Sequence, residues 1–366
     1  MIAGTNSGFS HRSDIDGLRG IAVLSVLGYH AFPATLPGGY TGVDVFFVIS
    51  GFLITGIILQ SLARDTFSFT GFYVRRIRRI FPALMVVLLA VYAFGLFALF
   101  PHELRQLSDH VVYGAGFASN FLLKRESGYF DNEAVTKPLL HLWSLGVEEQ
   151  FYILWPLLLW LGWKWRLNVG VIIIVIATGS FALNVFVTSV DQAAAFYSPQ
   201  TRFWELMTGS FLAYLCRGKA ADAGSSPTQK GALRGVQSLV GACLIFIGVT
   251  LDVTPREVWG CWTAIPVTGA ALIISAGPLA WFNRVFLSGR YLVLIGLISY
   301  PLYLWHWPLL SFAQIVEGAR PAAAVRAACV SAAVLLAWIT YRVVEKPLRY
   351  GRWGRAKAIG LLITLR

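Results

Sequence analysis

Charged residues are scarce in this chain: only 13% of its 366 residues are Asp, Glu, Lys or Arg, against about 25% in soluble proteins. Acidic residues are the fewest, 18 against 30 basic ones, which gives a formal net charge of +12. Hydrophobic residues make up 57% of the chain and the mean hydropathy is +0.65. This composition excludes an ordinary soluble domain and indicates a protein that crosses a membrane several times.

Cysteine is also rare, with four residues scattered at Cys216, Cys243, Cys261 and Cys329. None of them is spaced as zinc ligands are, so we expect small apolar packing residues and no metal site. The first sixteen residues are polar and lack the basic start and the cleavage site of a signal peptide, so we expect the first hydrophobic segment to be retained.

Apolar runs near membrane-spanning length predict an all-α fold, a polytopic bundle of about ten transmembrane helices. The runs are 17–32, 43–62, 80–100, 142–162, 169–188, 201–216, 235–251, 262–279, 291–315 and 322–344. Residues 1–350 would form one transmembrane domain. Residues 351–366 would form a cytoplasmic linker and the start of an incomplete further helix.

The charges between these runs predict the orientation. The connection 33–42 carries no charge, whereas 75–79 carries four arginines in what we expect to be a cytoplasmic loop. Residues 104–123 could be an eleventh span, but the basic stretch 217–234 would then lie outside. We therefore interpret 101–141 as an outer excursion with an interfacial or re-entrant helix, and both chain ends as cytoplasmic.

Arg19 and His30 lie eleven residues apart in the first run, on one face of a helix and about 16 Å from each other. Ionisable groups inside a membrane are costly and are candidates for function. The alternative is that Arg19 snorkels to the headgroups and His30 is an interfacial hydrogen-bonder. In the predicted topology, Arg19 lies at the cytoplasmic end and His30 at the outer end.

The arginine cluster that contains Arg76 and Arg79 would lie on the same side as Arg19. Guanidinium groups bind phosphates through charge-assisted, often bidentate bonds, so the cluster fits a polyanion. Plain anchoring of a cytoplasmic loop is the other interpretation.

Carboxylates are expected near the outer ends of two spans. Asp44 could orient the imidazole of His30 if the first two helices form a hairpin, or it could merely cap its own helix. Glu148 and Glu149 would lie about two turns below the outer surface. Because adjacent helical residues point about 100° apart, we expect at most one of them to face a given site.

Further polar residues suggest a crevice in the outer half of the bundle. Arg202 and Glu205 have the i,i+3 spacing of an ion pair, which could extend to a neighbouring helix. His306 lies between Pro301 and Pro308, which favour a broken helix. With His141, at the start of the fourth span, these residues form a group that would bind the acceptor or play a structural polar role.

Seven segments, in order along the chain, carry a family resemblance. They are Asp16–Ala22 with His30, Gly42–Ile54, Arg75–Pro82, His141–Tyr152, Arg202–Glu205, Ser299–Pro308 and Glu345–Arg349. Together they resemble the integral-membrane acyltransferase-3 family, which O-acylates bacterial surface glycans. The resemblance covers nearly the whole chain, and seven motifs in register are far more specific than any one of them.

The resemblance implies that Arg19 and His30 are the family's essential pair. Arg76 and Arg79 would be its arginine motif, which with Arg19 would bind acyl-CoA on the cytoplasmic side. Catalysis would rest on His30 with Asp44, Glu148 or Glu149 as its helpers. Ser50 has no neighbouring base in sequence, so we expect it only to pack. Some relatives carry an SGNH-type domain after a further span, and this sequence does not contain one.

The implied activity is transfer of an acetyl or other short acyl group from cytoplasmic acetyl-CoA to a hydroxyl of O-antigen, exopolysaccharide, peptidoglycan or a lipid-linked sugar. His30 could be a general base or a covalent acyl carrier. The protein would lie in the bacterial inner membrane, with lipid as a further partner and no nucleic acid, because its basic residues lie between apolar runs. A non-enzymatic flippase for a glycan-lipid is the main alternative, although no inverted repeat is evident. A structural anchor for an outer domain would leave the buried charges unexplained.

Overall fold

The computed structural model describes residues 12–127, 134–218, 227–251 and 259–350. Within these ranges the chain is helical and contains no strand, which confirms the all-α class. The long helices are α1 (Ser13–Ala31), α2 (Gly42–Ala63), α3 (Phe69–Ala98), α6 (Leu142–Lys164), α7 (Val169–Val190), α9 (Pro199–Gly218), α10 (Pro227–Thr250), α14 (Ser299–Glu317) and α15 (Ala323–Thr340). Shorter ones are α4 (Pro101–Ala115), α5 (Ser119–Glu126), α8 (Gln192–Tyr197), α11 (Trp259–Trp262), α12 (Ala264–Ala276), α13 (Arg290–Leu297) and α16 (Lys346–Tyr350). Four single turns complete the order: η1 (Gly39–Thr41), η2 (Ala134–Thr136), η4 (Asn283–Leu287) and η5 (Tyr341–Glu345).

Helices lie at all ten positions where a span was predicted, but the run 291–315 is divided between α13 and α14. Among the described residues, five helices are long and apolar enough to cross a membrane, and there are six if the bent pair α13–α14 is counted as one span. Charge excludes some of the others from this group, since α1 carries acidic residues in its first turn. A helical membrane protein is therefore supported, whereas ten crossings with both ends in the cytoplasm stay predictions. Residues 351–366, predicted as a linker, lie outside the described residues.

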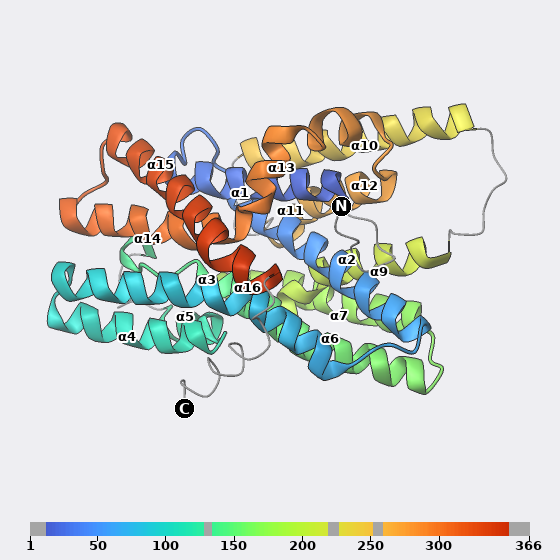
Figure 1. Ribbon diagram of the computed structural model, residues 1–366, viewed down its shortest axis with the longest axis horizontal. Helices are drawn as coiled ribbons and strands as arrows, with labels where there is room; N and C mark the ends of the chain where they lie inside the picture. The colour runs from blue at the N-terminus through green and yellow to red at the C-terminus, as the bar shows by residue number, and fades with distance from the viewer. Residues whose placement is uncertain (1–11, 128–133, 219–226, 252–258, 351–366) are drawn as a thin grey trace.

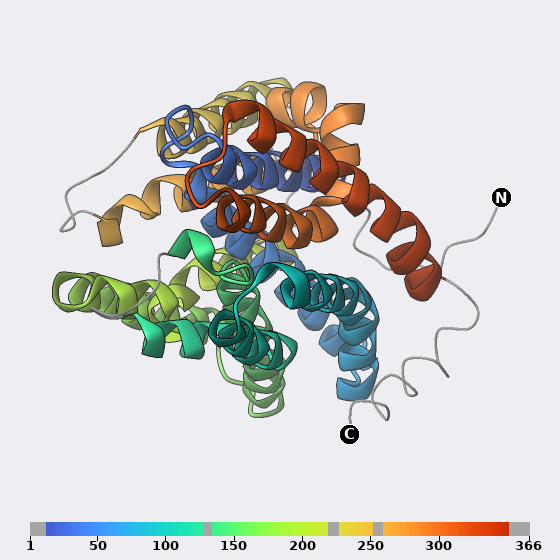
Figure 2. The ribbon, with the colours of Figure 1, turned by 90° about the vertical axis from the view of Figure 1, so that its left-hand side faces the viewer.

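The helices form two groups, which Figure 2 shows along the bundle. One group contains α1, α10 and α12–α15, and the other contains α3–α9 (Figure 1). Helix α2 packs against α1 and α12 on one side and against α6 and α9 on the other. It therefore joins the two groups at the centre of the molecule.

Helices α2 and α9 cross with their backbones in contact. A Cβ added at Gly51 would lie 1.8 Å from the carbonyl oxygen of Leu206, and one at Gly209 would lie 1.9 Å from that of Val48. Small residues at such crossings let helices approach closely, which is how helices gain packing energy in lipid. This approach brings the polar start of α9 against the start of α2.

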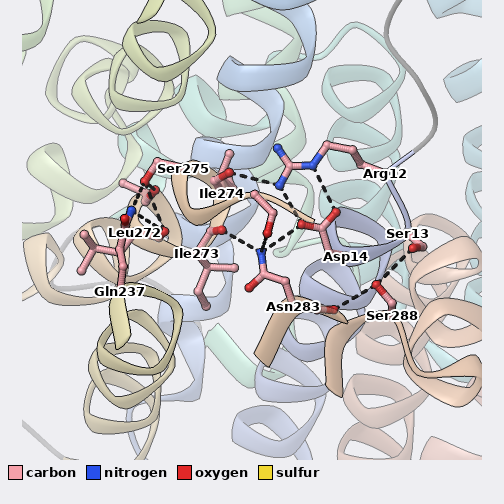
Figure 3. Close-up of polar contacts among 12 residues, drawn as sticks. Arg12, Ser13, Asp14, Gln237, Leu272, Ile273, Ile274, Ser275, Asn283 and Ser288 are labelled. Atoms are coloured by element: carbon pink, nitrogen blue, oxygen red, sulfur yellow. Dashed lines mark hydrogen bonds and ion pairs between the residues drawn. The ribbon is translucent and has the colours of Figure 1, made fainter. Parts of the chain in front are cut away.

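A polar network holds the start of α1 (Figure 3). The Asn283 amide donates to the carboxylate of Asp14 at 3.0 Å and to the carbonyl of Ile273 at 2.9 Å. Arg12 also donates to Asp14, at 2.6 Å, and to the carbonyl of Ile274 at 3.1 Å. Because Asp14 and Asn283 are buried, leaving either group unbonded would cost about 1–3 kcal/mol. The network therefore fixes the position of the helix that carries the predicted arginine–histidine pair.

Two local predictions were wrong. The segment 75–79 is not a loop but lies inside α3, which begins earlier because Ser68 caps it by accepting a hydrogen bond from the backbone of Gly71. The helix break that was predicted between Pro301 and Pro308 lies earlier in the chain. Helices α13 and α14 meet at a bend of 69° before Pro301, and His306 lies within the continuous α14.

The cysteines, predicted as small apolar packing residues, lie mostly at the surface of the bundle. Cys216, Cys243 and Cys261 are exposed, and only Cys329 is partly buried.

Candidate functional site

Two pockets lie between the central helices, and they share Val43 and Tyr303 as wall residues. We name them the arginine pocket, lined by Arg19, Arg76, Arg79, Glu148, Glu149 and Tyr152 among others, and the histidine pocket, lined by His30 and His141. Helix α1 contributes Arg19 to the first and His30 to the second. The predicted pair therefore joins two adjoining pockets along one helix.

The arginine pocket is narrow, with a volume of about 90 Å³. Arg19 lies 3.8 Å from the carboxylate of Asp16 on its own helix. The guanidinium of Arg76 lies over the ring of Tyr152, 5.6 Å from its centroid. Its Nε is buried and has no hydrogen-bond partner in the described part of the chain. A buried donor of this kind suits an anionic ligand.

Glu148 and Glu149 both line the arginine pocket, so two predictions about them were wrong. Neither of them lines the histidine pocket that contains His30. They also both face one site, although they are adjacent on α6. Glu149 is buried and its Oε1 has no hydrogen-bond partner among the described residues.

Glu148 is the acceptor in a small network. Its Oε1 accepts hydrogen bonds from the hydroxyl of Ser50, on α2, and from the hydroxyl of Tyr152, one turn along α6. Ser50 was expected only to pack, because no base neighbours it in sequence. Its partner lies 98 residues away along the chain. The bond from Ser50 joins α2 and α6 at the wall of the arginine pocket.

The histidine pocket has a volume of about 560 Å³, within the range of small-molecule sites. Aromatic rings supply much of its wall: Tyr29, Tyr40, Trp143, Phe196, Tyr197 and Trp307, in addition to the shared Tyr303. No Asp, Glu, Lys or Arg of the described residues lines it. The pocket is therefore suited to a ligand with both apolar and hydroxyl-bearing surface and no charge.

Three imidazoles meet at this pocket. The Nδ1 of His30 lies 2.9 Å from the Nε2 of His306, and their rings are stacked with centroids 5.2 Å apart. The ring of His141, from the residue that precedes α6, lies 5.7 Å from that of His306. Neither nitrogen of His141 has a side-chain hydrogen-bond partner among the described residues. The partner of His30 is thus a histidine rather than one of the predicted carboxylates.

Asp44 instead pairs with Arg202. The Arg202 guanidinium donates to the Asp44 carboxylate and lies 3.1 Å from Glu205, which confirms the i,i+3 ion pair and its extension to a neighbouring helix. All three side chains are buried, and Arg202 also lies over the rings of Phe47 and Trp143. A cation shared by two carboxylates and held by aromatic faces is structural in kind.

Tyr303 separates the two pockets, and the sequence analysis did not single it out. Its hydroxyl lies 2.6 Å from the hydroxyl of Ser144 and donates to the carbonyl of His141 at 2.8 Å. The available signal was its position three residues before His306, on the same face of α14.

Comparison with known proteins agrees with this geometry. The family model described as "Acyltransferase domain" matches residues 12–342. The chain belongs to the acyltransferase-3 family. No solved structure matches it significantly.

Named relatives of this acyltransferase-3 chain are bacterial. It is 30% identical to peptidoglycan O-acetyltransferase OatA of Listeria monocytogenes, over 92% of this chain and 55% of that protein. It is 33% identical to YrhL of Bacillus subtilis, provisionally named a peptidoglycan O-acetyltransferase, over 92% of this chain and 54% of that protein. It is also 33% identical to a Staphylococcus aureus protein provisionally named an O-acetyltransferase, over 92% of this chain and 57% of that protein. The chain spans about half the length of these relatives.

One more polar cluster lies beside α4 and α5 of this acyltransferase-3 chain, in the segment predicted as an outer excursion. Glu126 accepts a hydrogen bond from the Nζ of Lys137 at 2.8 Å and lies 3.1 Å from the Nε2 of His110. Partial burial alone would raise the pKa of Glu126, but the bonds from His110 and Lys137 outweigh it and lower that pKa to about 2. The cluster ties the segment after α5 to α14, because Trp307 donates to the carbonyl of Lys137 at 2.8 Å.

Proposed function

We propose that this chain is a membrane O-acyltransferase that moves an acetyl group from cytoplasmic acetyl-CoA to a hydroxyl of an extracytoplasmic glycan. The observation that carries the proposal is the pair of adjoining pockets, one cationic and one aromatic, joined at Tyr303 and both lined by α1. Acyl-CoA is made in the cytoplasm and surface glycans are completed outside. An enzyme that joins them needs a path of this kind through the bundle.

The donor would lie on the arginine side. CoA carries several phosphate charges, and Arg19, Arg76 and Arg79 offer forked donors at one pocket. Because that pocket is narrow, the nucleotide would remain at its mouth and only the pantetheine arm would enter. The thioester would then reach the shared wall near Tyr303, within reach of the histidine pocket.

Two chemical versions fit His30. As a general base, its free ring nitrogen takes the proton of the acceptor hydroxyl while the hydroxyl oxygen forms a bond to the thioester carbon. The carbon–sulfur bond then breaks, the sulfur leaves with the electron pair of that bond, and protonation gives free CoA. As a covalent carrier, the nitrogen itself attacks the thioester carbon, and the carbon–sulfur bond breaks as CoA leaves as the thiolate. The acceptor oxygen then attacks the acetyl carbon, the carbon–nitrogen bond breaks, and the hydroxyl proton passes to the released imidazole. Trapping acetyl-imidazole at His30 would favour the carrier.

The acceptor would lie in the histidine pocket. Sugar rings present apolar faces and neutral hydroxyls, which match aromatic walls without charged side chains. Because two relatives are named for peptidoglycan, we propose that glycan as the acceptor class. The acetyl group would reach it directly or through an outer domain, for which the additional length of the relatives leaves room. The protein would lie in the bacterial inner membrane, as a multi-pass protein.

The test uses the full chain in proteoliposomes with acetyl-CoA labelled in the acetyl group and soluble peptidoglycan fragments outside. We expect labelled ester on the glycan from the wild-type protein and at least about 10²-fold less from His30→Ala. Ser331→Ala, which removes an exposed hydrogen bond to the carbonyl of Ala327 within α15, is the matched control, because neither residue lines either pocket. Full activity of His30→Ala would refute the mechanism, and absence of transfer by the wild type to any glycan offered would refute the activity.

A further inference from the structure

The two stacked imidazoles form a directed hydrogen-bond chain that ends on a backbone carbonyl. The Nδ1 of His306 lies 2.6 Å from the carbonyl oxygen of Tyr303, one turn earlier on α14. A carbonyl oxygen can only accept, so the Nδ1 of His306 must carry the hydrogen. In a neutral ring the Nε2 of His306 is then a bare acceptor.

This assignment carries over to His30. Its Nδ1 lies 2.9 Å from the bare Nε2 of His306, so it must itself carry a hydrogen and donate it. The Nε2 of His30 is then unprotonated. No hydrogen bond from the described residues engages that atom, and His30 lines the histidine pocket.

Both rings are neutral in this arrangement. His306 is fully buried, and the third ring beside the pair is another imidazole, that of His141. No carboxylate of the described residues contacts either His30 or His306. An unpaired charge on either ring would therefore be expensive.

We propose that His306 is a positioning residue that holds His30 in the one tautomer whose Nε2 can act on substrate. It takes the part that a carboxylate plays in a serine–histidine–aspartate triad, where the wrong tautomer lowers kcat by about 10⁴-fold. A neutral imidazole does this without adding a second charge to a buried site. The proposal rests on the proposed function, since it assumes that His30 carries the chemistry.

Two amide substitutions separate this role from a merely structural one. The amide of Gln in His306→Gln reaches about as far as the Nε2 of the ring, so its oxygen can accept from His30. The shorter amide in His306→Asn reaches only about as far as Nδ1, so it can bond the Tyr303 carbonyl but not His30. Both replacements are neutral, polar and smaller than histidine.

In the proteoliposome assay we expect His306→Gln to keep kcat within about 10-fold of the wild type and His306→Asn to lower it by about 10²-fold, both with an unchanged KM for acetyl-CoA. Equal losses in the two variants, or a larger loss for Gln, would overturn the proposal. The thermal unfolding midpoint of each variant shows whether a loss comes from misfolding instead.

A second measurement does not depend on activity. In protein labelled with [¹⁵N]histidine, the His30 signals are those missing from His30→Ala, and their shifts report which ring nitrogen is protonated. We expect a single Nδ1-protonated tautomer in the wild type and in His306→Gln, and a mixture in His306→Asn. An Nε2-protonated His30 in the wild type would overturn the tautomer assignment. Absence of acetyl transfer by the wild type with the expected tautomer would instead refute the proposed function alone.

Discussion

Arg202 donates a hydrogen bond to Asp44 at the crossing of α9 and α2, and both side chains are 2% exposed. The carboxylate of Asp44 is paired with Arg202, so it does not orient the imidazole of His30 as the sequence analysis had allowed. The ion pair instead joins two central helices, and Glu205 adds a second carboxylate to the same guanidinium. None of these three charged residues lines either pocket.

We expect Arg202→Met to destabilise the protein by about 3–5 kcal/mol, because it leaves two buried carboxylates without their cation. The free energy of unfolding in mixed micelles, titrated with SDS, measures the loss. Arg64→Met is the matched control, since Arg64 is exposed and such a change costs at most about 1 kcal/mol. A loss within 1 kcal/mol for Arg202→Met would contradict this account.

Arg76→Ala should weaken binding of CoA by about 10- to 100-fold, since a charge-assisted hydrogen bond contributes about 1.5–3 kcal/mol. Calorimetric titration with CoA measures the change. Arg75→Ala is a close control, because Arg75 is the preceding residue of α3, is exposed and does not line the arginine pocket. If the two variants bind CoA equally well, the arginine pocket is not the donor site.

Gly51→Ala should destabilise strongly, because its Cβ would meet the backbone of Leu206 and force α2 and α9 apart. Gly179→Ala in α7 should instead be neutral or stabilise by up to about 1 kcal/mol, because nothing lies within 4 Å of its Cβ and alanine favours helices. Unfolding midpoints of the two variants test the contrast. Similar midpoints would show that the α2–α9 crossing is looser than described.

The Glu126 cluster predicts a loss of stability in acid. Because the pKa of Glu126 is lowered in the folded protein to about 2, its contribution is fully present above the unfolded pKa of about 4.5 and disappears as the pH falls toward 2. Unfolding midpoints measured between pH 6 and pH 3 should fall more for the wild type than for Glu126→Gln, which has lost the contribution already. Parallel pH curves would contradict the assignment.

Much of the fold could be predicted from the sequence because lipid imposes long apolar helices. Helices lie at every predicted apolar run, although 291–315 is divided between α13 and α14. Errors came where helix ends depend on local capping or bending. Ser68 starts α3 ahead of the arginines, and the bend at Ile298 precedes the proline that was expected to cause it. Apolar periodicity carries no signal for either.

In the candidate site, too, features within one helix could be predicted, whereas contacts between helices could not. That Arg19 and His30 share one face of a helix could be predicted from their spacing alone, because helix geometry fixes the relative positions of residues on one continuous segment. The partners Asp44–Arg202, Ser50–Glu148 and His30–His306 could not, because each joins helices that are far apart in sequence.

The sequence by itself determined that this is an all-α membrane protein of the acyltransferase-3 family, because scarce charge, apolar run length and ordered motifs are properties of the linear chain. Only the tertiary structure decided which polar groups meet. In the structure, Glu148 and Glu149 line the arginine pocket, Asp44 pairs with Arg202, and the partner of His30 is a histidine. The reason is physical: buried polar groups must satisfy one another across helices, and the packing of those helices sets which partner is within reach.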